Sequence, residues 1–248
     1  MAHRTRRQRY DLVIDAQGLL RSGVFAWATR APRRIGHADA AEGGAWWLTE
    51  RVASDPALHT VDRMMSLLEP LRVPAVMDLC LHTPPTDIVT PDEPYVVVAP
   101  TSRWASKRWP IERYDALAER LRSNYRVVVV GGPGERPQCA PLLHRATHDP
   151  RVIDCVGQTS VGGLMRLIER SSLVVANDSA ALHMAVGFDR PTVALFGPTR
   201  VDHVGPYGRE ADVIQHVRPD EQLDHKRDEQ VEVMRRINVD EVLDACNQ

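Results

Sequence analysis

The turn between residues 173–176 and residues 180–186 has the residue types of a phosphate-binding site. The first segment is a short apolar run, as in a buried parallel strand, and the second is a good helix former with Gly187 as a stop signal. Between them lie Asp178 and Ser179, which are types that cap helices. Backbone N–H groups at a helix start are free and partly positive, so this turn can bind a phosphate. A strand–helix–strand unit without a ligand has much the same pattern, and both interpretations stay open on these residues alone.

A second polar cluster, 100–110, follows the apolar run 95–99. Its hydroxyls, backbone amides and cations are the groups that a diphosphate requires. The cluster contains Lys107, one of only two lysines in the chain, because arginine supplies nearly all the positive charge. A lysine in this background suggests a point-charge donor, which differs chemically from a planar guanidinium. The alternative is a solvated basic loop.

A glycine-rich turn, 131–134, lies between the predicted strand 126–130 and Glu135. Its spacing differs from the dinucleotide pattern G-x-G-x-x-G, and Pro133 lacks an amide that a phosphate would need. Glu135 has two equal interpretations. It contacts a ligand, or it is an acidic residue favoured by the dipole of an ordinary helix start.

Strand and helix patterns alternate along the chain, which predicts an α/β fold with parallel sheets. Both polar turns would then lie at the carboxyl ends of strands, where open α/β sheets bind ligands. Five prolines within 74–94 indicate a linker. We therefore predict a first domain at 1–80, a linker at 81–94, a second domain at 95–235 and a terminal helix within 236–248.

Composition fits a soluble globular protein. A chain of 248 residues can form one large or two small domains with a sizeable core, and a net charge of -2 argues against non-specific nucleic-acid binding. The four cysteines have no metal-binding spacing, which favours reduced thiols in a cytosolic protein. The basic start, 1–7, does not lead into a signal-peptide pattern, and no apolar run approaches the roughly 20 residues of a membrane span.

Residues 178–199 read D-S-x-x-x-H-x-A-x-x-x-x-x-P-T-x-A-L-F-G-P-T, which closely resembles the signature of family 9 glycosyltransferases. These are the bacterial heptosyltransferases that build the inner core of lipopolysaccharide. The usual form is D-[ST]-G-x-x-H, so Ala180 takes the place of the glycine and adds a methyl group facing the ligand. The loop 100–110 resembles the family's P-[GT]-[AST]-R-W-x-x-K-R-W-P segment, and the resemblance extends over about 10–208.

The resemblance implies two Rossmann-like domains of the GT-B type, with the C-terminal helix 236–248 bracing the first domain. It also implies transfer of heptose, with inversion, from ADP-heptose to a lipopolysaccharide inner-core acceptor. It implies no metal or cofactor, no nucleic acid, and a cytoplasmic protein with at most peripheral contact at the inner membrane. Lys107 would contact the diphosphate, Glu135 the nucleoside, and Asp178 and His183 the phosphate or sugar hydroxyls. The full nucleotide-sugar site implied is Thr101, Ser102, Lys107, Glu135, Thr159, Asp178, Ser179, Ala180 and His183.

The start of the chain, 10–18, resembles the family's V-I-D-x-Q-G-L strand. In the family, a Gly-containing loop with the catalytic aspartate precedes this strand. We therefore expect an incomplete N-terminal domain and leave the catalytic base unassigned. Asp15 is the best substitute, although its family counterpart is better interpreted as structural.

Other functions stay open on the sequence. The rivals are an impaired remnant or fragment that only binds a nucleotide sugar, and another enzyme of the same fold, such as a sugar-nucleotide epimerase. A hydrolase triad of Asp178, Ser179 and His183 is excluded, because positions five apart on a helix diverge by about 140°. The pair His144 and His148 lacks a third metal ligand and is better explained as exposed. For Trp46 and Trp47 a core position is favoured over a sugar platform.

Overall fold

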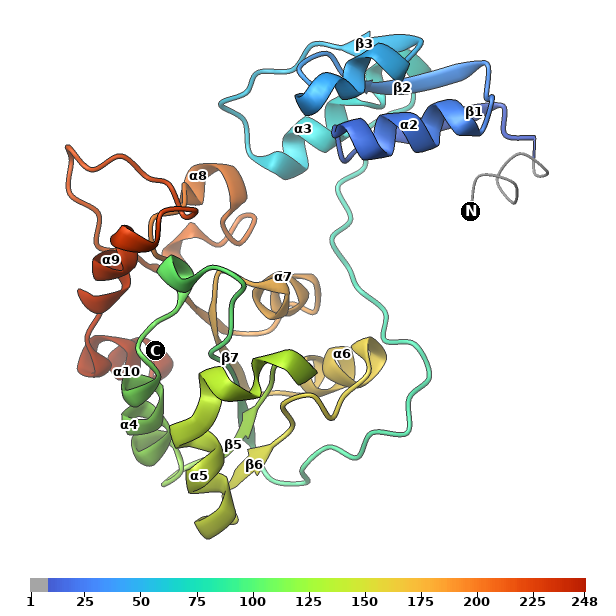
Figure 1. The fold of residues 1–248 in the computed structure, drawn as a ribbon. Coiled ribbons are helices and arrows are strands. Elements are labelled where there is room, and N and C mark those ends of the chain that lie inside the picture. The colour runs from blue at the N-terminus through green and yellow to red at the C-terminus, as the bar shows by residue number, and fades with distance from the viewer. Residues whose placement is uncertain (1–8) are drawn as a thin grey trace. The chain divides into compact units, whose positions relative to one another are not determined.

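The structure, a computed structural model, describes residues 9–248 apart from the side chain at 228 (Figure 1). The basic start of the chain, 1–7, lies outside the described residues. The chain divides into two compact units, Met1–Met77 and Asp78–Gln248. The division falls close to the predicted boundary at residue 80.

The first unit is built on a small parallel sheet in the order β1-β2-β3. Its core is formed by Ile35, Val52 and Leu67. Its elements are β1 (Leu12–Asp15), α2 (Leu20–Ala28), β2 (Arg33–His37), the 3-10 helix η1 (Ala41–Trp47), β3 (Glu50–Val52), α3 (Thr60–Ser66) and the 3-10 helix η2 (Glu69–Leu71).

Two glycines allow α2 and η1 to approach closely. A side chain at Gly23 would come within 2.5 Å of the Gly44 carbonyl oxygen, and one at Gly44 within 2.7 Å of the Leu19 backbone. Residues 41–47 form a 3-10 helix at this contact. The expectation that both tryptophans are core residues is wrong for Trp46, whose side chain is exposed (79%). Trp47 is half-buried against Trp27, with ring centroids 5.4 Å apart.

The second unit contains a six-stranded parallel sheet in the order β6-β5-β4-β7-β8-β9. Its strands are β4 (Tyr95–Ala99), β5 (Arg126–Val129), β6 (Val152–Asp154), β7 (Leu173–Asn177), β8 (Thr192–Leu195) and β9 (Val213–Ile214). Its helices are α4 (Ile111–Leu121), α5 (Ala140–His148), α6 (Val161–Glu169), α7 (Ala180–Gly187), α8 (Val201–Val204), α9 (Val231–Arg235) and α10 (Val239–Cys246). Short 3-10 helices connect them: η3 (Ala105–Lys107), η4 (Pro133–Cys139), η5 (Glu210–Asp212) and η6 (Asp228–Gln230).

Side chains on the two faces of this sheet belong to two separate cores. Val96, Val98 and their neighbours pack against α4, α5 and α10, whereas Val97 and its neighbours pack against α6 and α7 (Figure 1). The strands are apolar on both faces because helices cover both sides of the sheet. The unit is therefore a doubly wound sheet, which confirms the predicted α/β class with parallel sheets.

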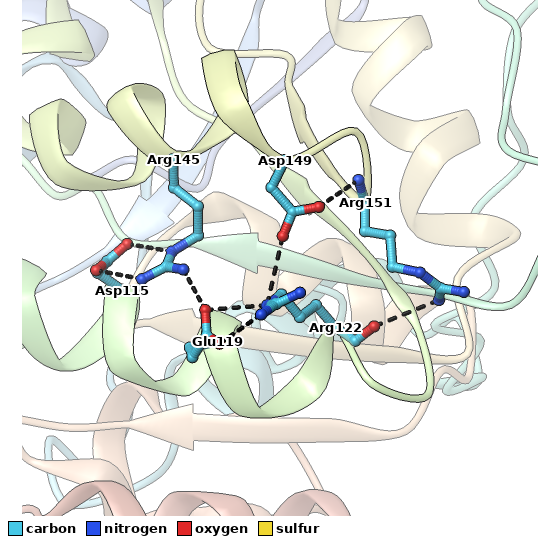
Figure 2. Close-up of polar contacts among 6 residues, drawn as sticks. All are labelled: Asp115, Glu119, Arg122, Arg145, Asp149 and Arg151. Carbon is cyan, nitrogen blue, oxygen red and sulfur yellow. Dashed lines mark hydrogen bonds and ion pairs between the residues drawn. The ribbon is translucent and has the colours of Figure 1, made fainter.

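An ion-pair network joins α4 to α5 on one of these faces. Arg145 extends from α5 to Asp115 (2.6 Å) and Glu119, and Arg122 bridges Glu119 (2.6 Å) to Asp149 (3.4 Å) (Figure 2). On the same face α10 packs against α4 and β8. Those contacts lie within the second unit, and the role of the terminal helix in bracing the first domain stays a prediction.

The predicted linker, 81–94, contains neither helix nor strand in the described chain, and it packs along the second unit. Leu81 N–H donates to the Gly187 carbonyl (2.8 Å), and the Thr83 hydroxyl donates to Glu169 (3.0 Å). Ile88 packs on the core beneath α6. The segment is thus attached to α6 and α7 at several points.

Candidate functional site

A cavity of about 530 Å³ opens at the carboxyl ends of β4 and β7. These strands are neighbours, but the chain leaves β4 toward α4 on one face and β7 toward α7 on the other. Such a switch point is where doubly wound sheets bind ligands. The cavity is lined by residues from four segments that follow strands or begin helices: Ala99, Thr101, Ser102, Arg103, Trp104, Lys107, Val130, Gly131, Gly132, Pro133, Glu135, Thr159, Ser160, Val161, Leu164, Asp178, Ser179, Ala180 and Ala181.

The charged centre of the cavity is an ion pair. Lys107 Nζ lies 2.6 Å from Asp178 Oδ2, and the two side chains are only 13% and 9% exposed. Within the described chain Oδ2 has no hydrogen bond of good geometry, although it is buried. The contact is therefore one of opposite charges, and the carboxylate keeps hydrogen-bonding capacity.

The start of α7 presents unused donors to the same cavity. Ser179 is the residue before the helix, with an extended backbone (φ -154°), and its side chain does not cap α7. Its hydroxyl is buried and has no hydrogen-bond partner among the described residues. Ala180 and Ala181, in the first turn of α7, also line the cavity. A helix start of this kind favours an anion, because its first N–H groups lack partners within the helix.

The loop after β4 is linked to the glycine-rich turn through Glu135. Glu135 Oε2 accepts hydrogen bonds from the Thr101 hydroxyl (2.6 Å) and the Gly132 N–H (2.7 Å). Both bonds use one oxygen, so Oε1 is left for another partner. Glu135 is thus a structural residue of this turn, and it also lines the cavity.

A buried asparagine that the sequence interpretation did not single out holds these loops together. Asn177, at the end of β7, accepts from the Tyr114 hydroxyl (2.8 Å) and donates to the Pro100 carbonyl (2.6 Å). It also accepts from Trp109 N–H (3.3 Å). A polar residue ending an apolar strand beside Asp178 is the signal that could have identified it. Asn177 therefore fixes the position of the loop 100–110 relative to β7.

The opposite wall comes from the start of α6 and the turn before it. Thr159 and Val161 line the cavity, and Ser160 caps α6 by accepting from Gly163 N–H (3.1 Å). Gly157 has φ +72°, and a side chain there would come within 2.6 Å of Pro133 Cα. This close approach joins the α6 wall to the glycine-rich turn.

Eight of the nine residues predicted for the site line this one cavity, and His183 does not. His183 lies on α7 and is exposed. In the first unit, Asp15 Oδ1 accepts from the N–H groups of Gln17 (3.0 Å) and Gly18 (3.2 Å), and Oδ2 accepts from Ser22 (2.9 Å). Both carboxylate oxygens of Asp15 therefore hold the turn before α2.

Comparison with known proteins agrees with this geometry. A family model for glycosyltransferase family 9 (heptosyltransferase) matches residues 1–233. The chain belongs to glycosyltransferase family 9. It is 33% identical over 215 residues to lipopolysaccharide heptosyltransferase 1 of Pseudomonas aeruginosa, covering 81% of this chain and 58% of that protein. It is 25% identical over 213 residues to lipopolysaccharide heptosyltransferase 3 of Escherichia coli, covering 80% and 62%. The chain thus spans about three fifths of the length of these family 9 relatives.

Solved structures show the same fold. The ADP-heptose lipopolysaccharide heptosyltransferase II of E. coli superposes with a TM-score of 0.77 at 22% identity, covering 99% of this chain and 78% of that one. The E. coli heptosyltransferase WaaC, solved with ADP, superposes with a TM-score of 0.70 at 22% identity, covering 93% and 73%. The predicted GT-B architecture is confirmed. None of the described helices is long and apolar enough to cross a membrane.

Proposed function

We propose that this chain binds ADP-heptose and that its cavity activates the ADP leaving group for heptose transfer, with inversion, to a lipopolysaccharide inner-core acceptor. The observation that carries the proposal is the meeting of Lys107, the unpartnered Ser179 hydroxyl and the α7 start in one cavity. These groups come from segments about 70 residues apart in the sequence, yet they face a single space. The reaction would take place in the cytoplasm, at the inner face of the inner membrane.

The chemistry follows from the charges. Breaking the bond between the sugar and the diphosphate develops negative charge on the leaving phosphate, and preorganised cations and amides lower the energy of that state. Lys107 supplies the cation, while the amides of Ala180 and Ala181 supply the helix start. Thr101 and Ser102 extend the phosphate subsite, and Glu135 and Thr159 mark the nucleoside end. His183 lies outside the cavity, and its contact with the phosphate or the sugar hydroxyls stays a prediction. No acceptor base is assigned, because Asp15 is committed to its turn.

A sugar-nucleotide epimerase is the rival with structural support. A UDP-N-acetylglucosamine 2-epimerase from Listeria monocytogenes superposes with a TM-score of 0.55 at 13% identity, so it shares the fold. The family match favours a heptosyltransferase. The nucleotide discriminates between them, since the proposal requires adenine and the rival uracil.

The test is a paired binding and turnover experiment. The chain should bind ADP-heptose and ADP in preference to UDP-N-acetylglucosamine and UDP. Release of ADP should depend on an added heptose-acceptor core oligosaccharide. Binding of UDP-N-acetylglucosamine in preference to ADP-heptose would reject the assignment in favour of the rival. Binding of ADP-heptose without acceptor-dependent ADP release would favour a chain that only binds nucleotide sugars.

A further inference from the structure

The charged segment 219–230 packs against the loop after β4. The Ser106 hydroxyl, which is buried, donates to the His225 carbonyl oxygen. The His225 ring meets the Trp104 indole edge-on, with centroids 5.7 Å apart. Trp104 lines the cavity, so His225 packs behind the wall that the loop after β4 forms.

Four charged groups act electrostatically on this imidazole. Lys107 and Asp178 belong to the cavity, and Asp224 and Lys226 are its neighbours in the sequence. Burial, followed by the Lys107 charge, holds the pKa of His225 below its ordinary value, and the two aspartates act in the opposite direction. The ring is therefore mostly neutral near neutral pH when no ligand is bound.

We propose that the His225 imidazole is a further residue of the nucleotide site, placed beside Lys107 to bind the diphosphate of the nucleotide as a second cation. The inference rests on the proposed function. An arriving diphosphate brings negative charge to the Lys107–Asp178 pair, and opposite charge favours the protonated ring. The ring takes one proton from the solvent, becomes imidazolium, and donates an N–H bond to a phosphate oxygen. Apart from this N–H bond, formed with a proton released by a solvent or buffer acid, no covalent bond changes.

Two contacts hold the His225 side chain and its backbone in place. Trp104 holds the imidazole by its edge, and the Ser106 bond fixes the backbone at the same residue. Both contacts come from the loop after β4, so they attach segment 219–230 to that loop through His225. A histidine fixed in this way differs from His148, which is exposed on α5 and stacks on His144 (centroids 4.7 Å).

The test counts protons on ADP binding. Titration calorimetry of the full chain is run near neutral pH in two buffers of different ionisation enthalpy, for the wild type, His225→Phe and the control His148→Phe. Phenylalanine preserves a ring against Trp104, so the anchor is kept while the titratable group is lost. We expect the wild type and the control to take up more protons than His225→Phe, which should bind ADP about tenfold more weakly. His225→Gln, polar and uncharged, should behave like His225→Phe.

The outcomes separate this inference from the proposed function. Equal proton uptake by wild type and His225→Phe, with ADP bound by both, would overturn the role of His225 and leave the nucleotide assignment standing. A wild-type chain that does not bind ADP would overturn the nucleotide assignment, and this inference with it. Thermal melting of each variant confirms that the comparison is made on folded protein.

Discussion

The Lys107 ammonium is paired with the Asp178 carboxylate, 2.6 Å away, inside the cavity. Only a small part of either side chain is exposed to solvent. The two residues follow different strands, β4 and β7, so the pair joins the two loops at the switch point of the sheet. A diphosphate that binds here must share the lysine with a fixed negative charge. Nucleotide affinity and loop stability are therefore linked through one contact.

Removing the lysine should weaken diphosphate binding selectively. Lys107→Ala is expected to lower ADP affinity by about 1.5–3 kcal/mol, the range for a hydrogen bond to a charged group, and AMP affinity much less. Titration calorimetry with both nucleotides measures the difference. Arg120→Ala, which removes a cation from an exposed position on α4, is the control. Equal losses for ADP and AMP would place Lys107 away from the diphosphate.

Removing the Asp178 carboxylate should lower the stability of the fold. Asp178→Asn leaves a buried ammonium without its counter-charge, and a broken buried pair costs about 3 kcal/mol. Saturating ADP should restore more stability to this variant than to the wild type, because a phosphate replaces the lost charge. Urea unfolding with and without ADP tests this. The control is Asp240→Asn, whose pair with Arg120 is exposed and should matter little. Unchanged stability of Asp178→Asn would refute the pairing.

The asparagine that ends β7 should be costly to replace. Asn177→Ala leaves the Tyr114 hydroxyl, Trp109 N–H and Pro100 carbonyl without this partner, and each buried unpaired group costs about 1–3 kcal/mol. Tyr114→Phe removes a single bond and should cost about 1 kcal/mol. Urea midpoints at constant slope measure both. If the two variants were equally stable, Asn177 would not be the centre of this network.

Acid should destabilise the segment that carries His225 at the pair between Glu221 and Arg236. Arg236 binds Glu221 through two bonds (2.6 and 2.9 Å) and, with the Arg218 N–H, lowers the pKa of Glu221 from 4.5 to about 2. A depressed carboxyl pKa stabilises the fold above the ordinary value, and that stability is lost as the pH falls toward about 2. Urea midpoints of Glu221→Gln should therefore fall less steeply than those of the wild type over this interval. Parallel curves would contradict the assignment.

The strand and helix periodicities of the sequence anticipated the doubly wound unit, because its strands are apolar on both faces and each is followed by a helix pattern. The cavity residues of the two polar turns were also predictable, since turns at the ends of parallel strands meet at one edge. Lys107 and Asp178 are 71 positions apart, and only this topology brings them together.

Other features depend on contacts that no local pattern encodes. Segment 219–230 is polar apart from Pro219 and Leu223, so nothing in its composition predicts that His225 packs against Trp104. Trp46 is exposed whereas its neighbour Trp47 is half-buried against Trp27, a difference that the residue types alone do not predict. His183 has the spacing of the family signature but lies one helical turn after Ala180, where it is exposed and outside the cavity.

Amide hydrogen exchange of the full chain with and without ADP tests the central claim most directly. Bound nucleotide should slow exchange in the cavity segments 101–107, 131–135 and 178–182, because ligand contacts suppress local opening there. The α4–α5 surface at 141–149 serves as the internal control and should not change. Slower exchange at 141–149, or no change in the three cavity segments at an ADP concentration of about 1 mM, where even weak binding is populated, would contradict the nucleotide site.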